Sequence, residues 1–142
     1  MPATADQARG GALHPVHAFL LAATVPLFLG AVLSDYAYTC TYHVQWSNFS
    51  SWLIVGGLVF AFVALLCSLI DLRRDDRRGG LFAVSLVLIL AVCVLGVVNA
   101  FVHARDAWAT MPTGIVLSVV VAVLACAATV LGFYTVRWRA TP

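Results

Sequence analysis

The chain has 142 residues, of which 63% are hydrophobic and only 10% are charged, and its mean hydropathy is +1.00. A soluble domain of this size carries far more charge, so the composition excludes that class and predicts an integral membrane protein with room for one domain. The net charge of +2 is too small for a nucleic-acid-binding surface, and we expect no nucleic-acid partner.

The chain opens with residues 1–13, which are small, polar and glycine-containing, and we expect them to be a disordered cytoplasmic N-terminus. His14 then precedes Pro15, which suits the first turn of a helix because its missing N–H would be unpaired there anyway. A transmembrane helix needs about 20 mostly apolar residues. The segments that qualify are residues 16–36, 51–70, 81–102 and 113–136. The sequence therefore predicts an all-α fold, an integral membrane four-helix up-down bundle that forms a single domain over residues 14–138.

Arginine supplies every basic residue, and its distribution predicts the orientation. Short cytoplasmic loops are rich in Lys and Arg, whereas loops on the other side are poor in them. With both termini cytoplasmic, only Arg105 lies on the outer side. The inner side then holds Arg9, Arg73, Arg74, Arg77, Arg78, Arg137 and Arg139. We therefore expect a multi-pass protein with both termini and the 71–80 loop inside.

Two features of the helices bear on packing. Pro26 interrupts the first apolar segment and frees the carbonyl of Ala22, which then needs a partner from a neighbouring helix or a water. The last segment carries a seam of small residues on one face, where helix backbones can approach closely. This seam consists of Ser118, Ala122, Ala125, Thr129 and Gly132. It predicts helix packing within the bundle, with a homo-oligomer interface as the alternative.

Polar side chains are costly within a bilayer, and two stripes of them point to a candidate site. His17, Thr24 and Asp35 share one face of the first helix, and Asn99 and His103 end a similar stripe on the third. Both helices run from the inner to the outer side, so their polar ends arrive at the same depth. We therefore predict an outer-side polar cluster. Its members are Asp35, Asn99, His103, Arg105 and Asp106, with His43 and Trp46 available from the outer loop.

A carboxylate and an imidazole at the membrane edge can relay a proton or bind a cation, and they can also simply pair helices and cap their ends. A second, inner-side group combines His14 and His17 with Asp71, which closes the second helix. These are ligand types for a divalent metal, but a tetrahedral site needs a fourth group. The alternative is a capped helix start with a hydrogen-bonded histidine.

Haem b is a further alternative, with His17, His103, His14 and His43 as the candidate ligands. A membrane b-type haem commonly uses two histidines from different helices at matching depth. His17 is on the inner side and His103 on the outer side, where only His43 could join it. This distribution argues against a bis-histidine haem within one copy and leaves open a single-ligand haem or one held between subunits. No other cofactor is predicted.

Several short motifs together resemble a known family. They are Leu13 to His17 opening the first helix, Gly30 to Asp35 closing it, Trp46, Ser51-Trp52 and Gly56-Gly57 to Asp71, Asn99 with His103 to Asp106, and Met111 to Gly114 with Ser118. Over residues 13–136 the chain resembles the small bacterial membrane proteins of the domain-of-unknown-function 2231 type, which have an N-terminal His-Pro motif and four transmembrane helices. The resemblance implies a bacterial inner-membrane location and carries no established activity.

From these observations we expect a non-enzymatic accessory or structural component of the bacterial inner membrane, in contact with the lipid bilayer and with other membrane subunits as candidate partners. One alternative is a haem-associated or other redox membrane subunit. The second is a small proton- or cation-coupled transport element that acts as an oligomer, because four helices leave little room for a pathway. An apolar bundle interior would favour the accessory or structural function.

Overall fold

A computed structural model describes residues 15–73, 80–105 and 107–137 of the chain. Its long helices are α2 (Pro15–Thr41), α3 (Val44–Arg73), α4 (Gly80–His103) and α6 (Thr113–Arg137), and a single short turn of helix, α5 (Ala107–Thr110), precedes the last of them. All four long helices are long and apolar enough to cross a membrane. The predicted all-α membrane bundle is confirmed. Residues 1–13, His14 and Asp106 lie outside the described residues.

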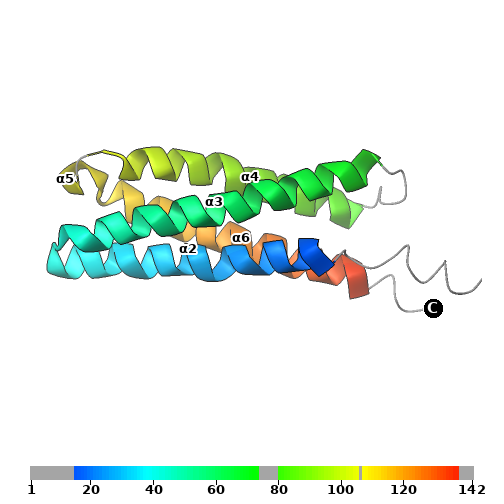
Figure 1. Ribbon diagram of the computed structural model, residues 1–142, viewed down its shortest axis with the longest axis horizontal. Coiled ribbons are helices and arrows are strands. Elements are labelled where there is room, and N and C mark those ends of the chain that lie inside the picture. Colours follow the sequence, from blue (N-terminus) through cyan, green and yellow to red (C-terminus); the bar gives the residue numbers. More distant parts are fainter. Residues whose placement is uncertain (1–14, 74–79, 106, 138–142) are drawn as a thin grey trace, which may run out of the picture.

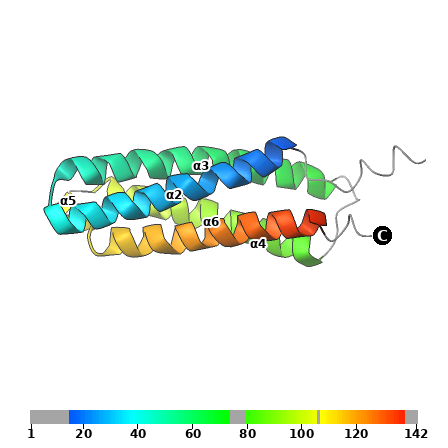
Figure 2. The ribbon, with the colours of Figure 1, turned by 90° about the horizontal axis from the view of Figure 1, so that it is seen from below.

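The four long helices form an up-down bundle in which α2 and α4 run in one direction and α3 and α6 in the other (Figure 1). The main helix contacts are α2 with α3, α3 with α4, α4 with α6, and α6 with α2. Each long helix is therefore antiparallel to both of its neighbours, and α2 and α4 face each other across the bundle (Figure 2). The start of α2 and the end of α6 lie at the same end, and the α2–α3 connection and α5 lie at the other. We call the latter the outer end, following the predicted orientation.

The outer connection between α2 and α3 is much shorter than the sequence suggested. We expected the first helix to end near residue 36 and the second to begin near 51, but α2 continues to Thr41 and α3 begins at Val44. Tyr42 closes α2 with a left-handed backbone (φ 56°), and its N–H donates to the carbonyl of Tyr38 at 2.8 Å. This is the αL closure common at helix ends. Polar and aromatic residues lower the hydropathy here without breaking the helix, so the helices extend past the apolar spans.

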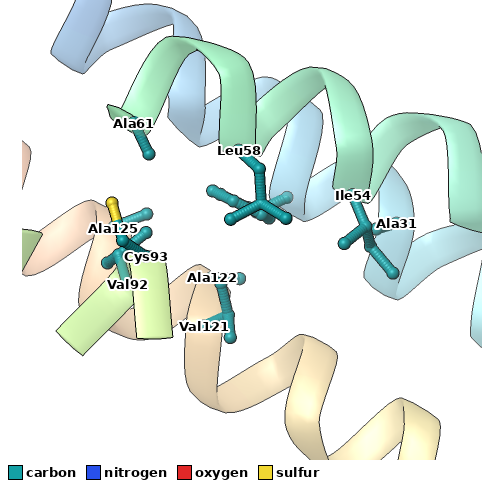
Figure 3. Packing of buried hydrophobic residues seen from close by; sticks show 10 residues of the cluster. Ala31, Ile54, Leu58, Ala61, Val92, Cys93, Val121, Ala122 and Ala125 are labelled. Atoms are coloured by element: carbon teal, nitrogen blue, oxygen red, sulfur yellow. The ribbon is translucent and has the colours of Figure 1, made fainter. Parts of the chain in front are cut away.

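The middle of the bundle is an apolar core built from side chains of all four long helices, most of them small or medium in size (Figure 3). Its buried members are Phe28, Ala31, Ile54, Leu58, Ala61, Val92, Cys93, Val121, Ala122 and Ala125. The alanines allow close approach of the helices. Gly57 also permits this, because a Cβ there would lie 2.8 Å from the ring of Phe28.

The small-residue seam of α6 faces this core and not the lipid. Ser118, Ala122, Ala125 and Thr129 are all at most 9% exposed. Thr129 also donates a hydrogen bond to the carbonyl of Leu21 on α2 at 3.0 Å, one residue before the carbonyl that Pro26 frees. The seam is thus used for packing within one copy, and it does not offer a surface to a second copy.

Candidate functional site: a buried carboxylate–imidazole network

The centre of the outer-end site is a direct contact between α2 and α4. His103 Nε2 lies 2.9 Å from Asp35 Oδ1, and both side chains are 0% exposed. Because α2 and α4 are opposite each other in the bundle, this pair lies across its interior. A titratable pair shielded in this way is stabilised only by the groups that surround it.

Two residues of α4 and α6 complete the hydrogen bonding of the pair. Ser118 donates its hydroxyl to Asp35 Oδ2 at 2.6 Å, a length typical of a hydroxyl bonded to a charged carboxylate. Asn99 Nδ2 in turn donates to Ser118 Oγ at 2.9 Å. The other imidazole nitrogen, His103 Nδ1, lies 3.0 Å from the backbone carbonyl oxygen of Asn99. Both oxygens of the carboxylate and both nitrogens of the ring are therefore engaged.

The helix α3 contributes Ser50, which is fully buried. Its hydroxyl donates to the carbonyl of Ala31 on α2 at 3.3 Å, and its oxygen lies 3.4 Å from His103 Nε2. These contacts are longer than those of Ser118, so Ser50 supports the pair more weakly. With Ser50, every long helix of the bundle supplies at least one side chain to the network. We use the name outer network for Asp35, Ser50, Asn99, His103 and Ser118.

The contacts fix most of the protons of the outer network. The Asn99 carbonyl can only accept, so His103 Nδ1 carries a hydrogen. The hydroxyl proton of Ser118 is directed to Asp35 Oδ2, which makes the Ser118 oxygen an acceptor for Asn99. One proton then remains between His103 Nε2 and Asp35 Oδ1, either on the ring or on the carboxyl group. The pair shares a single proton, and its loss would set a ring lone pair against a carboxylate oxygen.

Local sequence explains why these side chains meet. Asn99 and His103 are four residues apart and so lie on one face of α4. Gly114, the second residue of α6, leaves space for the ring, since a Cβ there would lie 3.0 Å from His103 Cε1. Above the end of α4, Thr110 of α5 is fully buried and donates to the carbonyl of Val102 at 3.3 Å. This hydrogen bond joins the short α5 to the end of α4, next to His103.

The structure brings together three of the five residues predicted for the outer cluster, namely Asp35, Asn99 and His103. Arg105 is exposed, and Asp106 lies outside the described residues. His43 is also exposed, and Trp46 belongs to α3 and not to a loop. Ser50 was not predicted as a partner, and Ser118 was predicted only as a member of the packing seam. The sequence feature that could have identified these two serines is their depth in the membrane. Each lies within two turns of the outer start of its helix, at the level of the predicted cluster.

The inner end holds a separate and simpler pair. His17 of α2 lies with Nε2 3.2 Å from Ser68 Oγ of α3, and Ser68 donates its own proton to the carbonyl of Ala64 at 3.0 Å. The serine oxygen is therefore the acceptor and the ring nitrogen the donor. Asp71 is half-buried near the end of α3, and His14 lies outside the described residues. Within the described ranges, no three His, Cys, Asp or Glu side chains are grouped as metal ligands.

Two of the candidate haem ligands, His17 and His103, are too far apart to hold one haem together within a single copy. His17 is eighteen residues before Asp35 on α2, a rise of about 27 Å, and His103 is bonded to Asp35. His17 and His103 are thus near opposite ends of the bundle. Both ring nitrogens of His103 already have partners, and Nε2 of His17 is bonded to Ser68. A haem would have to displace these contacts.

Comparison with known proteins gives a family and no further relative. The family described as "Predicted membrane protein (DUF2231)" matches residues 13–140, nearly the whole chain. No curated protein and no solved structure matches the chain.

Proposed function

We propose that this chain, which belongs to the DUF2231 family of predicted membrane proteins, is a non-enzymatic accessory or structural component of the bacterial inner membrane, in which the outer network fastens the outer end of the bundle. The observation that carries this proposal is that the Asp35–His103 pair is fully shielded and bonded by side chains from all four long helices. A site that acts on a substrate needs open positions, whereas each heteroatom of this pair is already engaged by another residue of the chain.

The position of the pair along the membrane normal supports the same function. The helix α4 has 24 residues, a length of about 36 Å, against about 30 Å for the hydrocarbon core of a bilayer. His103 is its last residue, so a bilayer centred on α4 would put the outer network at the outer boundary of the membrane. Substrate sites of transporters are typically near the midplane.

The interior between the two polar ends also favours a structural role. It is occupied by the apolar core, and the hydroxyls of Thr24 and Thr129 beside it donate to backbone carbonyls. Such hydroxyls satisfy the backbone of their own and neighbouring helices and do not form a polar path. The inner-membrane location rests on the family resemblance and on the arginines at the inner side.

A second candidate function, a proton-coupled transport element acting as an oligomer, is favoured by one observation. The Asp35–His103 pair holds a proton that either partner can carry. Intramembrane carboxylate and histidine chains are typical of proton pathways. This function would require the outer network to open, because the pair is buried when the bundle is closed.

The two functions are separated by reconstitution. Proteoliposomes with an enclosed pH-sensitive dye are given a pH gradient and a potassium diffusion potential. The structural proposal predicts the same slow proton leak as liposomes that carry the Asp35→Asn variant. A faster leak that Asp35→Asn abolishes would overturn the structural proposal in favour of the transport element. The direct test of the structural role is the unfolding of variants that lack Asp35, His103 or both.

A further inference from the structure

The side-chain amide of Asn99 is buried with only part of its hydrogen-bonding capacity used. The residue is 0% exposed, and Nδ2 gives one hydrogen bond, to Ser118. The amide oxygen Oδ1 has no hydrogen-bond partner among the described residues. An amide offers two N–H donors and two lone pairs, so an acceptor and one N–H of Asn99 remain available.

The orientation of this amide follows from its neighbours. Ser118 has one proton, which it gives to Asp35 Oδ2 at 2.6 Å. Its oxygen can therefore only accept from Asn99, and the group that faces it is the NH₂ and not the carbonyl. Turning the amide over would place two acceptors against each other and break the contact that positions Ser118. The oxygen thus stays without a donor from the part of the chain that the structure describes.

We infer that Asn99 holds an internal water molecule, which donates to Oδ1 and accepts the second N–H of Nδ2. Buried polar atoms that lack a protein partner are commonly satisfied by such waters, which make two to four hydrogen bonds. The pairing of one acceptor with one donor selects a small neutral molecule that can do both. A cation would be repelled by the N–H, and an anion by the carbonyl oxygen.

The water would be a member of the outer network, three hydrogen bonds from the carboxylate of Asp35. The chain of contacts runs from Asn99 through Ser118 to Asp35. A water at Asn99 would fix the amide plane, and through it the direction of the short Ser118–Asp35 bond. This inference does not depend on whether the bundle is structural or proton-coupled, because it concerns only the saturation of the amide.

The sequence offers a matched control for the test, because its only two asparagines are Asn48 and Asn99. Asn48 is exposed near the start of α3, whereas Asn99 is buried. We would label the protein with ¹⁵N at the asparagine side chains, reconstitute it in nanodiscs, and record magnetisation transfer from water to each NH₂ group. The variant Asn48→Ser lacks the Asn48 side-chain signal, so the asparagine signal that remains is assigned to Asn99. In a uniformly labelled sample, the backbone amides of Ile54 and Val121, both 0% exposed in the apolar core, set the dry baseline.

The expected result is transfer from water to both asparagines, with Asn99 well above the baseline of Ile54 and Val121. Transfer to Asn48 alone, with Asn99 at the baseline, would overturn the inference. The transfer is measured on the native chain, and the one variant, Asn48→Ser, changes an exposed residue and serves only for assignment.

Discussion

The 2.9 Å contact between His103 Nε2 and Asp35 Oδ1 joins two helices that are not neighbours around the bundle. The packing of adjacent helices alone would leave α2 and α4 connected only through α3 and α6. The pair connects them directly at the outer end, and Ser50 and Ser118 attach the remaining helices to it. A single polar cluster thus ties together all four long helices where the apolar core ends.

Space for the imidazole depends on Gly114. A Cβ at this position would lie 2.8 Å from Thr110 Cγ2 and 3.0 Å from His103 Cε1, so Gly114→Ala pushes on a ring that two hydrogen bonds hold in place. We predict a loss of about 1–3 kcal/mol in the free energy of unfolding, measured by denaturation in detergent.

The control for this substitution is Gly56→Ala on α3. A Cβ there meets only Leu27, at 3.9 Å, which is an ordinary contact. Because alanine favours a helix over glycine by about 1 kcal/mol, this variant should be as stable as the native protein or more so. Equal losses for the two variants would contradict the tight fit around His103.

Thiol accessibility tests the predicted orientation. Cys40 is exposed near the outer end of α2, whereas Cys93 is buried and Cys67 and Cys126 are half-buried within the apolar helices. A membrane-impermeant maleimide added to cells with a permeabilised outer membrane should label the native protein, and Cys40→Ser should remove the label. Labelling that begins only after the inner membrane is broken would show that the bundle is threaded in the opposite direction.

An absorption spectrum tests the haem alternative. Since His17 and His103 are near opposite ends of the bundle and both are hydrogen-bonded, we predict no haem signal. The protein should be purified in mild detergent from haem-replete cells and measured oxidised and dithionite-reduced. A Soret band with reduced α and β bands, lost in His103→Ala but kept in His17→Ala, would show that a haem displaces the outer network.

The sequence predicted the helices and the meeting of Asp35 with Asn99 and His103 because both follow from regular spacing. Hydropathy locates the membrane spans, and the two polar stripes end at one depth once the helices are threaded up and down. The predicted end of α2 and the predicted start of α3 were wrong, because hydropathy indicates the membrane boundary and not the end of a helix. The backbone of Tyr42, which closes α2, has no clear signature in the sequence.

The serine partners could not be predicted in the same way. Ser50 and Ser118 are ordinary small residues of membrane helices. Whether they face the Asp35–His103 pair depends on how α3 and α6 are rotated about their own axes, and the positions of charged residues do not determine this rotation. Ser118 shows this well, since the face that packs against α2 also directs its hydroxyl to Asp35. Arg105, in contrast, was grouped with the cluster by its position in sequence, and it lies exposed beyond the end of α4.

A double-mutant cycle on Asp35 and His103 tests whether this pair fastens the outer end of the bundle. Asp35→Ala, His103→Ala and the double variant would be unfolded in detergent together with the native protein. The control cycle uses Ser34→Ala in place of Asp35→Ala. Ser34 is buried, and its one hydrogen bond among the described residues goes to the carbonyl of Gly30 in its own helix. We predict a favourable coupling of about 0.6 kcal/mol and up to about 1.7 kcal/mol for Asp35 with His103, the range found for hydrogen bonds between membrane helices, and none for Ser34 with His103. If the effects of Asp35→Ala and His103→Ala are simply additive, the pair does not fasten the outer end of the bundle.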